Sequence, residues 1–197
     1  MTDKMIKSIF TWKYFCVYLC GPIDAADDGG KGWREEYVQK LIEIGFNKEQ
    51  IFNPCKKPIS HQLFNFDNEQ ELMHEAKSKE DWDELCNIVD QIAHIDLRLV
   101  DYSGLVIANF PLDKNGNRVP TYGSMHEIVE ARRQKKPVFV IWPGGKKTCS
   151  GWLMWLVGHK NVFETIEECI ECLKKISNGE TPYNAKDWLL LNLDKVK

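Results

Sequence analysis

The stretch that decides the fold is KYFCVYLCGPIDAADDGGKGWREEYVQKLIEIG, residues 13–45. Residues 13–20 form an apolar, aromatic run that stops at Gly21-Pro22, as a buried strand would. A loop rich in glycine and aspartate follows, and residues 33–45 then predict a helix that Gly45 can cap at its carboxyl end. A buried strand followed by a helix is the first half of a unit from which parallel sheets are built.

The same alternation of apolar strands and helices continues along the chain. Four further strands are expected within residues 50–55, 104–110, 137–142 and 161–163. Helices are expected at about residues 79–97, after the Gly123-Ser124 pair, in residues 152–157 and at about residues 164–176. Continuous apolar strands alternating with helices imply a parallel sheet that is covered on both faces. The sequence therefore predicts an α/β fold, a three-layer αβα sandwich with a doubly wound, flavodoxin-like or Rossmann-like parallel sheet of about five strands.

Length and composition favour one globular domain. The chain has 197 residues, which is enough for a sizeable core, and its 28% charged and 43% hydrophobic residues are normal for a globular protein. We therefore predict a single domain over residues 1–197. Residues 56–78 are polar and poorly periodic, and they are predicted to be an insertion outside the core.

Charge and cysteine usage exclude several classes of protein. The net charge of -3 comes without a clustered Lys/Arg block, which disfavours a nucleic-acid polymer as partner but leaves a nucleotide possible. No apolar run reaches the length of about 18 residues that a membrane span needs. An odd count of seven cysteines without framework spacing suits a cytoplasmic location. The CxxC at Cys169 and Cys172 fits one face of a helix, and the histidines lack metal-binding spacing, so neither metal nor cofactor is expected.

An aspartate occupies an unusual place in the helix expected at residues 79–97. Trp82, Leu85, Val89 and Ile92 form an apolar stripe at spacings of three and four, and Asp96 is the next member of that series. A carboxylate in an apolar row costs free energy unless it is paired or protonated. Two interpretations stay open: the helix has ended and Asp96 accepts hydrogen bonds from loop amides, or Asp96 is a carboxyl with a raised pKa that can pass a proton.

Glu127 also allows two interpretations. It lies three residues after Ser124, which is the spacing of a capping box in which the glutamate reaches back to the start of its own helix. Alternatively, Glu127 is held over a site, because ligands of parallel sheets bind beyond the carboxyl ends of the strands. The start of this helix belongs to that edge, where the backbone amides of Gly123 and Ser124 could hold an anion.

The loop after the first strand adds polar groups to the same edge of the sheet. Tyr18 precedes the turn at Gly21, and Asp24 and Trp33 follow it. Neither GxGxxG nor GxxxxGK[ST] fits the glycines of this loop, so a phosphate cradle of those types is not expected. The sequence also lacks the GxSxG elbow of α/β-type serine hydrolases.

Three segments together resemble a known family. YLCGPID (18–24), HIDLRLVDYSGLVIANF (94–110) and TYGSMHEIVEA (121–131) resemble, in order and character, the nucleoside 2-deoxyribosyltransferase superfamily, which includes relatives that hydrolyse nucleosides or nucleotides. The resemblance spans about residues 14–142. It implies an enzyme that cleaves the N-glycosidic bond of a (deoxy)nucleoside or nucleotide and transfers the sugar to a free nucleobase. It also implies a homo-oligomer, a dimer or higher.

The resemblance assigns roles residue by residue. Glu127 matches the nucleophilic glutamate that traps C1′ of the sugar, Tyr18 matches the tyrosine that orients it, and Asp96 matches the aspartate that protonates the leaving base. Gly123 and Ser124 match the turn beneath the sugar or its 5′-phosphate. The full predicted substrate-binding set is Gly21, Asp24, Trp33, Asn109, Asp113, Gly123 and Ser124.

The sequence departs from the family in two places, and these keep alternatives open. Family transferases carry an aspartate a few residues before the glutamate, whereas the nearest preceding acid here is Asp113, well upstream. A family asparagine supplied by a neighbouring subunit has no clear match in CSGWLMWLV (149–157), where Trp152 and Trp155 suit either an interface or a core. The alternatives are a hydrolase using the same site and a non-catalytic nucleotide-binding sensor.

Overall fold

The computed structural model of the protein describes residues 13–56, 68–178, 180 and 188–191. The strands in these residues are β1 (Val17–Cys20), β2 (Ile51–Phe52), β3 (Leu105–Asn109), β4 (Val138–Ile141) and β5 (Val162–Phe163). They form one all-parallel sheet in the order β2-β1-β3-β4-β5. This is the flavodoxin-like strand order, and it confirms the predicted fold class.

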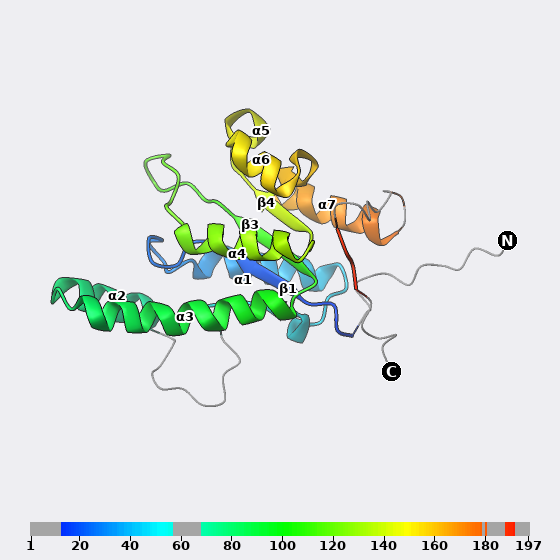
Figure 1. Cartoon of the computed structure of the whole chain (residues 1–197). Helices are drawn as coiled ribbons and strands as arrows, with labels where there is room; N and C mark the ends of the chain where they lie inside the picture. Colours follow the sequence, from blue (N-terminus) through cyan, green and yellow to red (C-terminus); the bar gives the residue numbers. More distant parts are fainter. Residues whose placement is uncertain (1–12, 57–67, 179, 181–187, 192–197) are drawn as a thin grey trace.

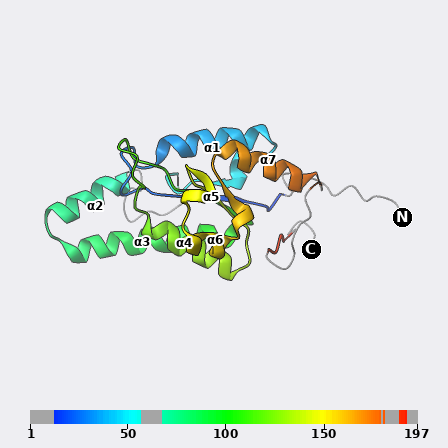
Figure 2. The same cartoon turned by 90° about the horizontal axis from the view of Figure 1, so that it is seen from above.

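Helices cover both faces of this sheet. They are α1 (Lys31–Glu43), α2 (Glu69–Ser78), α3 (Trp82–Tyr102), α4 (Tyr122–Arg133), α5 (Gly145–Thr148), α6 (Gly151–Val157) and α7 (Ile166–Ser177), with short 3-10 turns η2 (Lys48–Gln50) and η4 (His159–Asn161). Helices α1 and α7 lie on one face, and α3, α4 and α6 lie on the other (Figure 2). Helices α2 and α3 pack against each other as a hairpin that projects past the sheet (Figure 1).

Alternation along the strands divides the core into two layers. Val17 and Leu19 of β1 pack in the cluster beneath α1 and α7, whereas Tyr18 and Cys20 pack in the cluster beneath α3, α4 and α6. Successive side chains of a strand point to opposite faces of the sheet, so this division follows from the backbone itself. Tyr18 is therefore turned toward α4, which carries Glu127.

The long helix extends further than its sequence pattern indicates. It was expected at about residues 79–97, but α3 runs to Tyr102 because Leu99 and Val100 continue its buried side. Asp96 thus lies inside a regular helix, with 6% of its surface exposed. The interpretation in which the helix ends before Asp96 is excluded.

Part of the expected insertion at residues 56–78 is a regular helix. Residues 57–67 lie outside the described residues, whereas Glu69–Ser78 forms α2. Met73 and Ala76 of α2 pack with Ile88 of α3 in a small apolar cluster of their own. The α2–α3 hairpin therefore has its own small apolar core, which the polar composition of residues 56–78 did not indicate.

Helix α6 exposes two large aromatic side chains. Trp152 and Trp155 are 72% and 70% exposed, with ring centroids 5.3 Å apart, while Leu153 and Leu156 of the same helix are buried. The core interpretation of the two tryptophans is excluded. No helix within the described residues is long and apolar enough to cross a membrane.

Candidate active site

Two side chains distant in sequence meet at the carboxyl edge of the sheet. The hydroxyl of Tyr18 donates a hydrogen bond to Oε1 of Glu127 at 2.8 Å, and both side chains are buried. Helix α4 begins at Tyr122 with Thr121 as its N-cap, so Ser124 is already inside the helix. The capping-box interpretation is therefore excluded, and the Glu127 carboxylate is instead held from the neighbouring strand.

Burial fixes the protonation of the groups around Glu127. The pKa of Tyr18 lies well above its ordinary value, first because the phenol is fully buried and then because of the charges of Glu127 and Asp96. Burial likewise raises the pKa of Cys20 well above its usual range, and its Sγ donates to the backbone oxygen of Ser124 at 3.6 Å. Tyr18 therefore stays a hydrogen-bond donor to the carboxylate at neutral pH.

A cavity of about 340 Å³ opens beside the Tyr18–Glu127 pair. Its volume falls in the range of about 300–1,000 Å³ that is typical of small-molecule sites. The predicted site residues that line it are Tyr18, Gly21, Asp24, Asp96, Gly123, Ser124 and Glu127. The structure thus brings together the end of β1, the middle of α3 and the start of α4, as expected for the ligand edge of a doubly wound sheet.

Asp96 lines the cavity from α3. It lies four residues after Ile92, and Ile92 and Val89 line the same cavity. Asp96 is buried and close enough for its charge to raise the pKa of the Tyr18 hydroxyl. Among the acids that line the cavity, Glu127 accepts a hydrogen bond from Tyr18, and Asp96 lies on the same helix as the apolar lining residues Val89 and Ile92.

Trp33 and Asn109 are not among the residues that line this cavity. Val106 pairs with Tyr18 across the sheet, so Val106 and Ala108 share the face of Tyr18, and Asn109 points to the other face. There the Oδ1 atom of Asn109 accepts a hydrogen bond from the hydroxyl of Tyr37 at 3.2 Å. The ring of Trp33 lies 5.0 Å from that of Tyr37, in the layer of α1.

Asp113 also lies away from the cavity lining, in the loop after β3. Its Oδ1 accepts hydrogen bonds from the backbone amides of Asn115 and Asn117, each at 2.8 Å. The hydrogen bond from the Asn117 amide is the main cause that lowers the pKa of Asp113. Its carboxylate therefore closes a turn of its own loop.

Sequence reasoning missed the contribution of α2. Glu69 and Met73 line the cavity from this helix, and Glu69 is 4% exposed. The spacing of Met73 and Ala76 is a helical signal, but it is too short to predict a helix within so polar a stretch. The position of this helix over the site follows from its packing on α3, which sequence periodicity does not specify.

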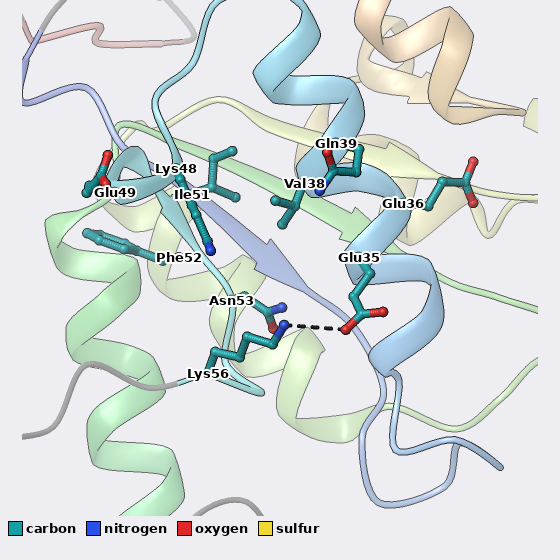
Figure 3. Close-up of a pocket in the computed structure, with 10 residues that line it drawn as sticks. All are labelled: Glu35, Glu36, Val38, Gln39, Lys48, Glu49, Ile51, Phe52, Asn53 and Lys56. Atoms are coloured by element: carbon teal, nitrogen blue, oxygen red, sulfur yellow. Dashed lines mark hydrogen bonds and ion pairs between the residues drawn. The ribbon is translucent and has the colours of Figure 1, made fainter.

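A larger cavity of about 730 Å³ lies elsewhere, against the edge strand β2 (Figure 3). It contains none of the predicted site residues, and Figure 3 shows Lys56 reaching over it to Glu35, at 3.3 Å. A surface ion pair of this kind is typical of an exposed groove and supplies no reactive group. Chemistry rather than size therefore identifies the smaller cavity as the candidate site.

The described residues contain no group of three or more His, Cys, Asp or Glu side chains arranged to hold a metal ion. In comparisons with known proteins, no protein-family model and no curated protein matches this chain. The geometry of the site is therefore the basis on which a function can be inferred.

Proposed function

We propose that this protein is a nucleoside 2-deoxyribosyltransferase-like enzyme that cleaves the N-glycosidic bond of a (deoxy)nucleoside or nucleotide and transfers the sugar to another base. The observation that carries the proposal is the 2.8 Å hydrogen bond from Tyr18 to Glu127 in a cavity that Asp96 also lines. Breaking a C1′–N bond develops positive charge on the sugar and negative charge on the base. A carboxylate can stabilise the positive charge on the sugar, and a proton donor can neutralise the negative charge on the base.

The three residues divide the reaction among them. An oxygen of the Glu127 carboxylate forms a bond to C1′ while the C1′–N bond breaks and its electron pair passes to the base. Asp96, in its protonated form, gives its proton to that base as it leaves. Tyr18 holds Oε1 and so presents the carboxylate in one orientation. A second base then loses a proton to Asp96, attacks C1′ and releases Glu127.

The remaining walls of the cavity suit the two halves of such a substrate. Met73, Val89 and Ile92 offer an apolar surface beside Asp96, which fits the faces of a nucleobase. The start of α4 offers the backbone of Gly123 and the side chain of Ser124, which fit sugar oxygens or a 5′-phosphate. No cofactor enters the proposed reaction.

An exchange assay tests the proposal. Incubating a deoxynucleoside with a second free base should give the exchanged nucleoside, whereas release of free sugar alone would identify the site as a hydrolase. Glu127→Ala should abolish both activities and the covalent glycosyl adduct. Glu130→Ala is the matched control on the same helix, since Glu130 pairs with Arg133 at 2.9 Å on the outside of the protein. Ligand binding without any turnover would instead favour a nucleotide sensor.

The proposal includes a homo-oligomer in the cytoplasm. The exposed pair Trp152 and Trp155 supports association with a second copy, because large aromatic side chains are enriched in the buried centres of interfaces. Tyr122, at the rim of the cavity, is 89% exposed and begins α4, which packs beside α6.

A further inference from the structure

The segment after β1, residues 21–30, forms one wall of the cavity and is called the β1 loop. Its residues 21–25 all line the cavity. Between β1 and α1 the loop has no regular secondary structure apart from turns. A wall built from such a segment keeps its shape only if its backbone is held from behind.

Arg34 of α1 holds the two ends of the β1 loop. Its side chain is fully buried, and its Nη2 donates to the backbone oxygen of Gly21 at 2.7 Å. Its Nη1 donates to the backbone oxygens of Pro22 at 3.3 Å and Gly30 at 2.8 Å. The guanidinium lies 4.3 Å from the ring of Trp33. One cation thus joins both ends of the loop.

Gln70 of α2 holds the part of the β1 loop between these two ends. Its Nε2 lies within hydrogen-bonding distance of three backbone oxygens, those of Ile23 at 3.3 Å, Asp24 at 3.1 Å and Ala26 at 2.8 Å. Gln70 does not itself line the cavity, so these carbonyl groups turn toward a donor behind the wall. Lys77 of the same helix adds an ion pair to Asp24 at 2.7 Å.

The direction of these carbonyl groups matters because the cavity is already acidic. Asp24, Glu69, Asp96 and Glu127 all line it. Carbonyl oxygens turned inward would add partial negative charge beside these groups and compete with substrate for hydrogen bonds. Anchoring the carbonyl groups to Gln70 and Arg34 keeps that side of the peptide groups away from the substrate.

We infer that Gln70 is a positioning residue for substrate binding, through which α2 fixes the β1 loop as a wall of the active site. The inference rests on the proposed function, since it concerns binding at the same cavity. It gives the helix of the polar segment a role in the site. Gln70 touches no reacting atom and acts through the backbone of residues 23–26.

Gln70→Glu tests this inference because it keeps the shape of the side chain and replaces the donor by an acceptor. The variant should raise KM for the nucleoside by about tenfold or more and change kcat by less than about threefold, since a lost binding wall weakens ground state and transition state alike. Amide hydrogen exchange of residues 21–30 should become faster. Gln70→Lys replaces the two N–H donors of the amide by the three of an ammonium group, so its KM should stay within about threefold of the wild-type value.

Gln91→Glu is the matched control, because Gln91 of α3 donates to Asn87 at 3.2 Å on the exposed side of the hairpin. It should leave both KM and loop exchange unchanged. An unchanged KM in Gln70→Glu, with or without a lower melting temperature, would overturn the inference. If Gln70→Glu does not fold, Gln70→Met removes the donor without adding charge and carries the same expectation.

The exchange measurement separates this inference from the proposed function. If the wild type turns over no nucleoside, the proposed function fails, and loop exchange in the Gln70 variants still reports whether α2 holds the β1 loop. If the wild type is active and the Gln70 variants have the same KM and the same loop exchange as the wild type, the inference alone fails.

Discussion

Two loops leave neighbouring strands at the carboxyl edge of the sheet, and they differ in what their aspartates do. The β1 loop lines the cavity, and its Asp24 pairs with Lys77 and His74 of α2. The loop after β3 carries Asp113, whose carboxylate accepts hydrogen bonds from the amides of its own loop. One aspartate connects its loop to another element beside the site, whereas the other connects its loop to itself.

The partners of an aspartate distinguish a structural acid from a candidate functional one. Asp113 is followed by Asn115 and Asn117, and the aspartate side chain reaches their amides because the chain turns locally. Such a carboxylate has its lone pairs used within its own loop. Asp24 finds its partners on a helix distant in sequence, at the rim of a cavity. An acid of the second kind is the better candidate for contact with a ligand.

After Glu127→Ala, the largest effect is expected at Asp96, which lines the same cavity as the β1 loop. Asp96→Asn removes the proton donor and should lower kcat about 10²- to 10⁴-fold for an ordinary nucleoside. A substrate whose base leaves as a stable anion should be affected far less. Steady-state kinetics with both substrates measure the difference. An equal loss of kcat with the two substrates would show that Asp96 does not protonate the leaving base.

A smaller effect is expected at Tyr18, which lies in β1 shortly before the β1 loop. Tyr18→Phe should lower kcat about 10- to 100-fold, because a hydrogen bond to a charged group contributes about 1.5–3 kcal/mol. Burial, and then Glu127, hold the pKa of Tyr18 well above its ordinary value, so its hydroxyl stays protonated as the pH rises past neutral. The alkaline limb of the kcat profile should therefore be the same in both proteins. Its disappearance in Tyr18→Phe would contradict this protonation state.

The smallest effects compare the two aspartates directly. Asp24→Asn should raise KM several-fold, up to about tenfold, because a charged partner of the substrate is lost. Asp113→Asn should leave KM unchanged and lower the melting temperature. The hydrogen bond from the Asn117 amide lowers the pKa of Asp113, so its stabilisation is present above the unfolded pKa of about 3.9 and is lost as the pH falls through the folded pKa.

Thermal denaturation from neutral to acid pH checks this sign. The difference in melting temperature between wild type and Asp113→Asn should shrink at acid pH. Asp27→Asn is the control within the β1 loop, since Asp27 is exposed and should show no such narrowing. A raised KM in Asp113→Asn, or an unchanged one in Asp24→Asn, would reverse the assignment of the two loops.

Much of the fold could be predicted from local patterns. The apolar runs bounded by glycine and proline predicted a parallel sheet of about five strands, and the sheet within the described residues has five. The apolar stripe of α3 predicted a buried position for Asp96, and Asp96 is buried, whereas Trp82 and Val89 of the same stripe are exposed. The first strand was predicted to start too early, at residue 13, because the apolar and aromatic run begins in the turn before β1 (Val17–Cys20).

Sequence periodicity predicted which candidate site residues lie at the same edge or on the same face of the sheet. Tyr18 and Glu127 were placed at one edge because parallel strands bring their carboxyl ends together. Side-chain alternation along β3 places Asn109 on the opposite face of the sheet from Val106, the partner of Tyr18. Counting residues along β3 could therefore have shown that Asn109 does not line the cavity. The spacing of Asp113 to Asn115 and Asn117 could have shown that its carboxylate binds the amides of its own loop. These are local rules, and their signals were in the sequence.

The sequence by itself determined the period of each element and, through it, which side chains share a face. The tertiary structure decided which faces meet: that α4 presents Glu127 to Tyr18, and that α2 closes the β1 loop through Gln70. The physical reason is that periodicity is a property of one segment, whereas a hydrogen bond between residues 109 positions apart depends on how separate elements pack. Packing is fixed by the combined burial of all the faces at once, and no single stretch of sequence contains that information.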